Sequence, residues 1–283
     1  MKRRLEKYLE ANRELWNEWT PIHAKSEMYD VARFKQGRSS LKAIELQELG
    51  DVKGKSLLHL QCHFGLDTLS WARLGAEVTG VDFSEKAIEL ARQLSAELQI
   101  PAKFICADVW DLHPAQRDGL QCVSTMKDRQ FNVVFTSYGV LCWLPDLKPW
   151  GEVIAHSLKP GGIFYIVEIH PVLTMFDNSA GGTGLRVTAP YFHSAEPTRW
   201  EPEGTYADPA AKTTQPSYEW THSMSDVLNA LIAAGLRIES VHEFPYCVYR
   251  HFPFMERGAD GWWRLPASTP AMPLMFSLKA TRM

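Results

Sequence analysis

Acidic and histidine side chains stand where strand-like runs end, and such positions suit ligand binding and proton transfer. Asp82 and Asp108 each close a run of mostly apolar residues. Each carboxylate could accept hydrogen bonds from donors on a bound ligand. His170 follows a third run and could act as a general base or hold an acceptor. His193 and His222 are weaker candidates for the same role.

The turn after the first strand-like run narrows the class of ligand. It reads Leu-Gln-Cys-His-Phe-Gly over residues 60–65 and contains a single glycine, Gly65. Dinucleotide binding needs three glycines so that the backbone can approach the pyrophosphate, and here Gln61 and His63 fill that space. This disfavours a nicotinamide-dependent dehydrogenase. His59 and His63 are four residues apart but lie in a strand and turn rather than on a helix, so we expect no metal site.

The elements that position these side chains alternate between strands and helices. The patterns predict strands at 56–60, 77–82, 102–106, 131–136 and 163–167, and helices at 65–74, 85–98 and 150–158. This alternation indicates βαβ units and a parallel, doubly wound sheet. Ligands of such sheets bind beyond the carboxyl ends of the strands.

The end of the chain completes the expected sheet. A helix is predicted at 225–234, followed by strands at 236–244 and 273–281. No crossover helix separates these two strands, so we expect them to be antiparallel to each other.

Two further segments are expected around the ligand. Residues 1–50 form an N-terminal helical segment whose tryptophans, Trp16 among them, either cover the ligand as a lid or pack the segment on the sheet. Residues 51–283 form one core domain. Within it, about 171–222 is predicted to be an inserted cap, because it carries six prolines and no clear periodicity.

Four stretches, in their order and spacing, resemble the class I S-adenosylmethionine-dependent methyltransferases. They read LLHLQCHFGLDTLSWARLGAEVTGVDFSEKAIELAR, FICADVWDL, FNVVFTSYGVLCWLPD and LKPGGIFYIVEIHP, and together they span about residues 56–171. The similarity is greatest to a bacterial branch whose first motif reads LHLQCHFG. The resemblance implies a Rossmann-like, seven-stranded doubly wound α/β sheet whose last strand is antiparallel. Relative to the usual first motif, His59 replaces an acid, and Gln61 and His63 replace two glycines.

The resemblance also implies S-adenosylmethionine as the cofactor, released as S-adenosylhomocysteine. In the family pattern Asp82 accepts from the ribose hydroxyls, Phe83 packs on the adenine, and Asp108 accepts from the adenine amino group. For His63 a structural role and a cofactor contact remain open alternatives. The expected cofactor contacts are Trp16, Tyr29, Gln61, Cys62, His63, Gly65, Asp82, Phe83, Ser84, Ala107, Asp108, Val109 and Ser137.

The expected function is methyl transfer to an oxygen or nitrogen atom, and in second place a carbon atom, of a small-molecule acceptor. His170 is the candidate base, and Tyr138 could pack against the sulfonium or the acceptor through a cation–π contact of about 0.5–2 kcal/mol. The alternatives are a nucleic-acid or protein methyltransferase and a non-catalytic S-adenosylmethionine-binding regulator. The 30 basic and 33 acidic residues give no basic surplus, which argues against nucleic acid.

Composition sets the expected compartment and assembly. With 45% apolar and 22% charged residues the chain is an ordinary globular protein. No apolar run approaches 18 residues, so we expect no membrane span. The five cysteines include no C-x-x-C pair, which is typical of reduced thiols in a cytoplasmic protein. We expect a monomer or a homodimer.

Overall fold

A computed structural model describes residues 2–113, 126, 129–179 and 181–283 of the chain. Four cysteines in these ranges are free thiols, and Cys122 lies outside the described residues. No helix among the described residues is long and apolar enough to cross a membrane. The described ranges also hold no group of three or more side chains arranged to bind a metal ion.

A seven-stranded sheet forms the centre of the core, as predicted. Its order is β3-β2-β1-β4-β5-β11-β8, and β11 is antiparallel to both of its neighbours, β5 and β8. The order reverses between β1 and β4, and their carboxyl ends meet there. The strands are β1 (Ser56–Leu60), β2 (Glu77–Asp82), β3 (Lys103–Cys106), β4 (Phe131–Ser137), β5 (Leu158–Ile169), β8 (Leu236–Phe244) and β11 (Met275–Arg282).

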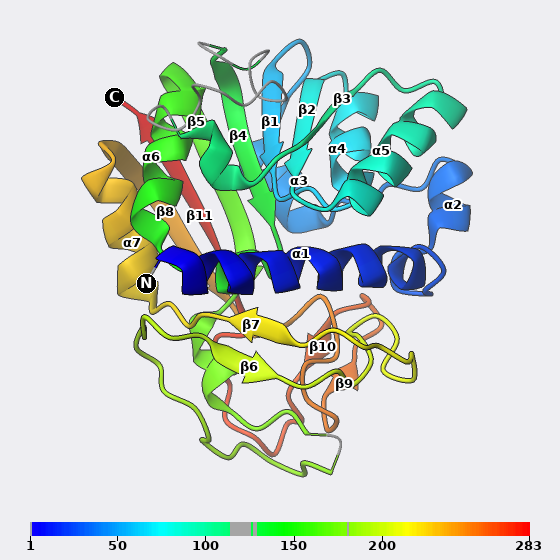
Figure 1. Ribbon diagram of the computed structural model, residues 1–283, viewed down its shortest axis with the longest axis vertical. Coiled ribbons are helices and arrows are strands. Elements are labelled where there is room, and N and C mark those ends of the chain that lie inside the picture. The colour runs from blue at the N-terminus through cyan, green and yellow to red at the C-terminus, as the bar shows by residue number, and fades with distance from the viewer. Residues whose placement is uncertain (1, 114–125, 127–128, 180) are drawn as a thin grey trace.

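Helices cover both faces of the sheet (Figure 1). Alternate residues of β1 face opposite sides, as the pleat of a strand requires. Leu57 packs in one core cluster with Trp71, and Leu58 packs in another with Trp150. The helices of the core are α3 (Ala43–Leu49), α4 (Leu66–Arg73), α5 (Glu85–Glu97), α6 (Leu147–Ser157) and α7 (Met224–Ala233).

Several elements differ from the sequence-based expectation, and β5, for example, begins at Leu158 instead of 163. Helix α6 begins three residues before the predicted 150, because the Asp146 side chain accepts the Lys148 N–H and caps the helix there. The N-terminal segment also contains the short helix α2 (Val31–Lys35), which the Asp30 side chain caps. Short 3₁₀ turns follow three strands at η1 (Val109–Leu112), η3 (Leu141–Trp143) and η4 (Pro171–Met175).

Helix α1 (Lys2–His23) lies across the molecule between the core and the cap (Figure 1). It contacts α5 of the core and β7 of the cap. The cap contains two small antiparallel pairs: β6 (Thr198–Trp200) with β7 (Ser217–Glu219), and β9 (Glu256–Arg257) with β10 (Trp263–Arg264).

The cap draws on a second segment that the sequence analysis did not assign to it. This segment, residues 245–274, connects β8 to β11 and lies on the same side of the sheet as residues 171–222 (Figure 1). Phe252 packs against Phe176 with ring centroids 6.3 Å apart, and Tyr249 lies 6.2 Å from Tyr206. The cap is therefore made of two segments that are far apart in the chain.

Candidate active site

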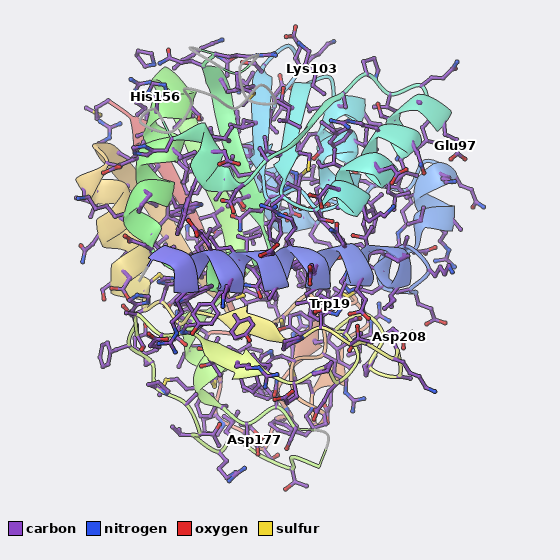
Figure 2. All side chains as sticks on the ribbon, in the orientation of Figure 1. Trp19, Glu97, Lys103, His156, Asp177 and Asp208 are labelled. Atoms are coloured by element: carbon purple, nitrogen blue, oxygen red, sulfur yellow. The ribbon has the colours of Figure 1, made fainter. Side chains whose placement is uncertain are left out.

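One cleft of about 2810 Å³ opens at the carboxyl ends of β1, β2, β4 and β5. Helix α1 and the cap form its other walls, and Trp19 of α1 lies at the boundary between core and cap (Figure 2). A pocket for one drug-sized ligand measures roughly 300–1,000 Å³. This cleft therefore has room for more than one small molecule.

The turn between β1 and α4 forms the floor of the cleft in an unusual backbone conformation. Gln61 and His63 have positive φ angles of 56° and 49°, which non-glycine residues adopt mainly where function or close packing requires it. At Gly65, with φ 78°, a Cβ atom would approach the Phe104 ring to 2.6 Å. The Gln61 amide donates to the Val140 carbonyl at 3.0 Å, and its Oε1 is buried without a partner.

Two further residues at this turn are buried and uncharged. His59 is bonded through Nδ1 to the Thr68 hydroxyl at 2.8 Å, and burial lowers its pKa to about 4. The Cys62 thiol is buried, which raises its pKa well above the ordinary value. Both residues line the cleft as neutral groups.

Asp82 reaches the same turn from the end of β2. Its two carboxylate oxygens accept the backbone N–H groups of His63 at 2.8 Å and Ser84 at 2.9 Å. Each carboxylate oxygen has two lone pairs, so one acceptor position per oxygen remains for a ligand. Burial raises the pKa of Asp82 to about 6, and these backbone bonds oppose the shift. Phe83, the next residue, also lines the cleft.

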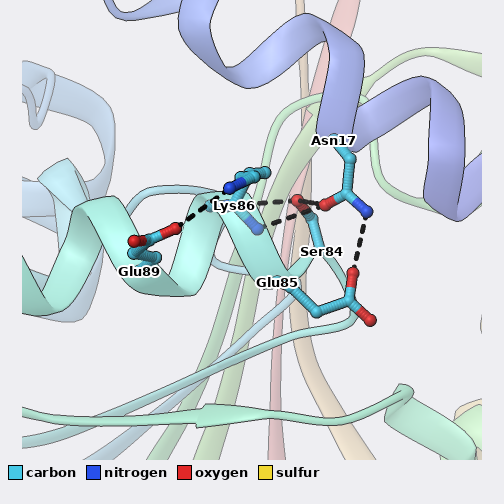
Figure 3. Close-up of polar contacts among 6 residues, drawn as sticks. Asn17, Ser84, Glu85, Lys86 and Glu89 are labelled. Carbon is cyan, nitrogen blue, oxygen red and sulfur yellow. Dashed lines mark hydrogen bonds and ion pairs between the residues drawn. The ribbon is translucent and has the colours of Figure 1, made fainter.

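Helix α1 is tied to the core beside Asp82 (Figure 3). The Ser84 hydroxyl donates to Asn17 Oδ1 at 2.8 Å, and the Lys86 N–H donates to the same oxygen at 3.1 Å. The Asn17 amide donates in turn to Glu85 at 2.8 Å. Ser84 is also the N-cap of α5, so Asn17 binds the first turn of that helix.

The residues after β3 lie outside the cleft lining. Asp108 caps η1 by accepting the Trp110 N–H at 3.0 Å, and burial raises its pKa. The charge of Arg13, on α1, acts on this carboxylate. Ala107 and Val109 are buried. The lining of the cleft on this side stops at Phe83.

The loop after β4 lines the cleft, but its side chains bond to the core. The Ser137 hydroxyl donates to Asp67 at 3.0 Å, and the Tyr138 hydroxyl donates to Glu45 of α3 at 3.0 Å. Glu45 is fully buried, which raises its pKa to about 7. Tyr138 has φ 42°. Its hydroxyl is thus held by α3, which leaves the ring for packing.

Glu168, at the end of β5, holds this loop in place, and sequence reasoning did not single it out. Its carboxylate accepts backbone N–H groups from Gly139, from Val140 at 2.7 Å, from Leu141 at 3.3 Å and from Ile169 at 2.6 Å. The side chain is 3% exposed. The only sequence signal was an acid at the end of an apolar strand.

Rings from four separate segments meet over the β1–α4 turn, and we call them the lid aromatic cluster. Within it, the rings of Trp16 and His63 lie 5.0 Å apart, and Tyr29 and Tyr206 are joined by a 2.5 Å hydrogen bond between their hydroxyls. The indole N–H groups of Trp16 and Trp19 are buried without a partner. The cluster comprises Trp16, Trp19, His23, Tyr29, His63, Trp143 and Tyr206.

The predicted histidine bases are not brought to the cleft as free groups. His170 accepts the Val172 N–H through Nδ1, its Nε2 lies 2.8 Å from Glu243 of β8, and it does not line the cleft. His222 Nε2 donates to the Leu144 carbonyl at 2.6 Å, and its ring stacks on His193. The structure therefore gives no support to His170 as the base, because its ring lies against Glu243 of β8 and outside the lining of the cleft.

Comparisons with known proteins find similarity in the core. A family model described as a methyltransferase domain matches residues 57–162. The chain is 28% identical over 173 residues to a ubiquinone biosynthesis O-methyltransferase of Coxiella burnetii, which covers 58% of this chain and 68% of that protein. A protein of the same name from Proteus mirabilis is 28% identical over 168 residues, which is 53% of this chain and 64% of the relative.

A solved structure shares the fold over nearly the whole chain. It is that of an S-adenosylmethionine-dependent methyltransferase from Mesorhizobium loti, with a TM-score of 0.57 and 22% identity, and the match covers 85% of this chain and 98% of the other. The curated relatives, by contrast, are matched over only about two thirds of their length.

Proposed function

Because the chain is a class I S-adenosylmethionine-dependent methyltransferase, we propose that it methylates an oxygen or nitrogen atom of a small molecule held between the lid and the cap. The cofactor, when bound, supplies a methyl group activated by its sulfonium. One observation carries the proposal: a single cleft extends from Asp82 and the β1–α4 turn into the cap. A donor and an acceptor can thus lie side by side in it.

The polar groups of the cleft fit the cofactor. Asp82 keeps free lone pairs for the two ribose hydroxyls. The buried, unpartnered Oε1 of Gln61 is an acceptor suited to the cofactor's ammonium group. Phe83 offers an apolar face for the adenine. Asp108 and Val109 would meet the adenine edge once α1 moves aside.

The protein's own contribution is alignment and exclusion of water. Holding donor and acceptor in line can lower the barrier by about 7–11 kcal/mol. Helix α1, with Trp16 and Trp19, covers the cofactor end and is held to α5 through Asn17. The loop after β4, held by Glu168, forms the wall beside the reacting atoms.

The walls of the cleft, made by α1 and the two cap segments, favour a small acceptor over a macromolecule. The cap aromatics at the far end, such as Trp262 and Trp263, suit an apolar or planar group. A regulator without catalysis would leave no acceptor space beside the cofactor, and here the cleft continues into the cap. We place the enzyme in the cytoplasm as a monomer or homodimer.

Calorimetry and a product screen test this function. S-adenosylmethionine and S-adenosylhomocysteine should bind with micromolar or tighter affinity, and NAD should not bind. Release of S-adenosylhomocysteine is then followed with a set of phenols, catechols and primary amines. Binding of NAD in preference to both sulfur compounds would overturn the proposal.

A further inference from the structure

Strand β7 presents one carboxylate to the acceptor part of the cleft. Its central residue, Tyr218, exchanges two backbone hydrogen bonds with the Asn12 side chain of α1, at 2.7 and 2.8 Å. Successive side chains of a strand point to opposite faces. Ser217 and Glu219 accordingly lie on the other face, and both line the cleft, whereas Tyr218 does not.

A second contact places Glu219 beside the loop after β4. The Trp220 N–H donates to the Cys142 carbonyl at 2.8 Å, so the end of β7 lies against η3. The loops after β1 and β4 flank the point where the strand order reverses, which is where a ligand sits in such sheets. Glu219 therefore faces the acceptor from the cap side.

The carboxylates of Glu168 and Glu219 lie near the same side chains, but only the carboxylate of Glu219 still has an oxygen that can accept a proton. Burial raises the pKa values of Cys142 and Tyr249, and the negative charges of Glu168 and Glu219, which lie near both side chains, raise them further. Glu168 spends its lone pairs on four backbone N–H groups. From the part of the chain that the structure describes, Glu219 accepts one hydrogen bond, from the Ser217 hydroxyl to Oε1 at 2.8 Å, which leaves its second oxygen for the acceptor.

We propose that Glu219 is the catalytic base, and that the acceptor is a molecule whose methylated oxygen or nitrogen carries a proton. The inference rests on the proposed methyltransferase function. The heteroatom gains its bond to the methyl carbon while the carbon–sulfur bond breaks and leaves its electron pair on sulfur. The proton lost by the heteroatom passes to the Glu219 carboxylate and from there to water when the product leaves.

The surroundings of Glu219 suit this role. Burial raises its pKa above the ordinary glutamate value, and the Ser217 hydroxyl opposes the shift. The titratable groups facing it are the Cys142 thiol from η3 and the Tyr249 phenol from the second cap segment. Burial keeps both neutral near pH 7. On β6, the residue paired with Glu219 is the uncharged Thr198.

The test combines two variants with a control, on the acceptor found in the product screen. Glu219→Gln keeps the shape but cannot take a proton, so kcat/KM should fall about 10²–10⁴-fold and the acid limb of its pH profile should disappear. Ser217→Ala removes the bond that lowers the pKa, so the acid limb should move to higher pH. Glu256→Gln, an exposed cap variant outside the cleft, should match the wild type.

Two readouts do not depend on turnover. The affinity for S-adenosylhomocysteine should stay within about twofold in Glu219→Gln. Infrared difference spectra of wild type minus Glu219→Gln should show a protonated carboxyl band that titrates above the ordinary glutamate range. In Ser217→Ala this band should titrate at a higher pH than in the wild type.

The outcomes separate this inference from the proposed function. Wild-type activity with an unchanged pH profile in Glu219→Gln, or no titrating band, would overturn the role of Glu219 and leave the function standing. If the wild type binds S-adenosylhomocysteine but methylates none of the phenols, catechols and primary amines, the proposed acceptor class is contradicted. The assignment of Glu219 as its base is then contradicted as well.

Discussion

His23 Nδ1 of helix α1 and His63 Nε2 of the β1–α4 turn lie 3.1 Å apart in the interior. Burial lowers the pKa of His23 to about 3 and that of His63 well below its ordinary value. Both rings are therefore neutral near pH 7, and a hydrogen bond between them joins the lid to the floor of the cleft. The Tyr206 hydroxyl of the cap lies 3.5 Å from the same His23 nitrogen.

This pair predicts a loss of stability in mild acid. A histidine with a lowered folded pKa stabilises the fold fully above about pH 6.5, and this stabilisation is lost as the pH falls toward the folded value. Between pH 7 and pH 5 the wild type should lose about 1–2 kcal/mol more free energy of unfolding than His23→Asn. Urea titrations at the two pH values measure this difference. An equal loss in both proteins would contradict the prediction, and the exposed His193→Asn should behave as the wild type.

Asp82→Asn should weaken cofactor binding without unfolding the protein. The amide keeps the size of the side chain but removes the charge that would accept from two hydroxyls. A charged hydrogen bond contributes about 1.5–3 kcal/mol, so the affinity for S-adenosylhomocysteine should fall roughly 10–100-fold. Calorimetry measures it, with the exposed Asp51→Asn as the control. Full affinity in Asp82→Asn would remove Asp82 from the ribose site.

Asn17→Ala should loosen the lid. The substitution removes the bonds to Ser84, Glu85 and Lys86 that tie α1 to α5. We expect faster amide hydrogen exchange along α1 and faster release of S-adenosylhomocysteine, with a loss of about 1–2 kcal/mol in stability. Glu89→Gln, which removes only an exposed ion pair, should change neither. Unaltered exchange in Asn17→Ala would show that α1 is held by its packing alone.

Glu168→Gln should destabilise the core. The amide can accept at its oxygen only, and its NH₂ group would face backbone donors from the loop after β4. Leaving buried N–H groups unpaired costs about 1–3 kcal/mol each, so we expect a loss of at least about 2 kcal/mol in the free energy of unfolding. Urea denaturation checks this, and the exposed Glu239→Gln should stay within about 0.5 kcal/mol of the wild type. A near-neutral Glu168→Gln would mean that water or the loop itself satisfies these groups.

Local patterns in the sequence were sufficient for the framework. Alternating strands and helices predicted the sheet, and the two antiparallel final strands were expected from their short connection. The acids that end β2 and β3 stood out because strand ends and helix starts have recognisable residues. Asp82 lies in the cleft, while Asp108 caps η1 beneath α1.

Side-chain direction at strand ends could not be predicted. His170 looked suitable because it follows β5, but its ring bonds to Glu243, a partner 73 positions later in the chain. Glu168, two residues earlier, faces the cleft instead. His170 comes after the last residue of β5 and is the N-cap of η4, so the alternation of the strand does not set the direction of its side chain. No local pattern states which β8 residue will lie beside it.

The sequence by itself determined the fold class and the carboxyl edge of the sheet where the cleft opens, because both follow from short-range periodicity. Only the tertiary structure decided what closes the site. Asn17 meets Ser84, His23 meets His63, and Trp220, the residue after Glu219, meets the loop after β4, through contacts between segments 40 to about 80 residues apart. Such contacts depend on how α1 and the two cap segments pack over the sheet, and packing between distant segments leaves no periodic trace in the chain.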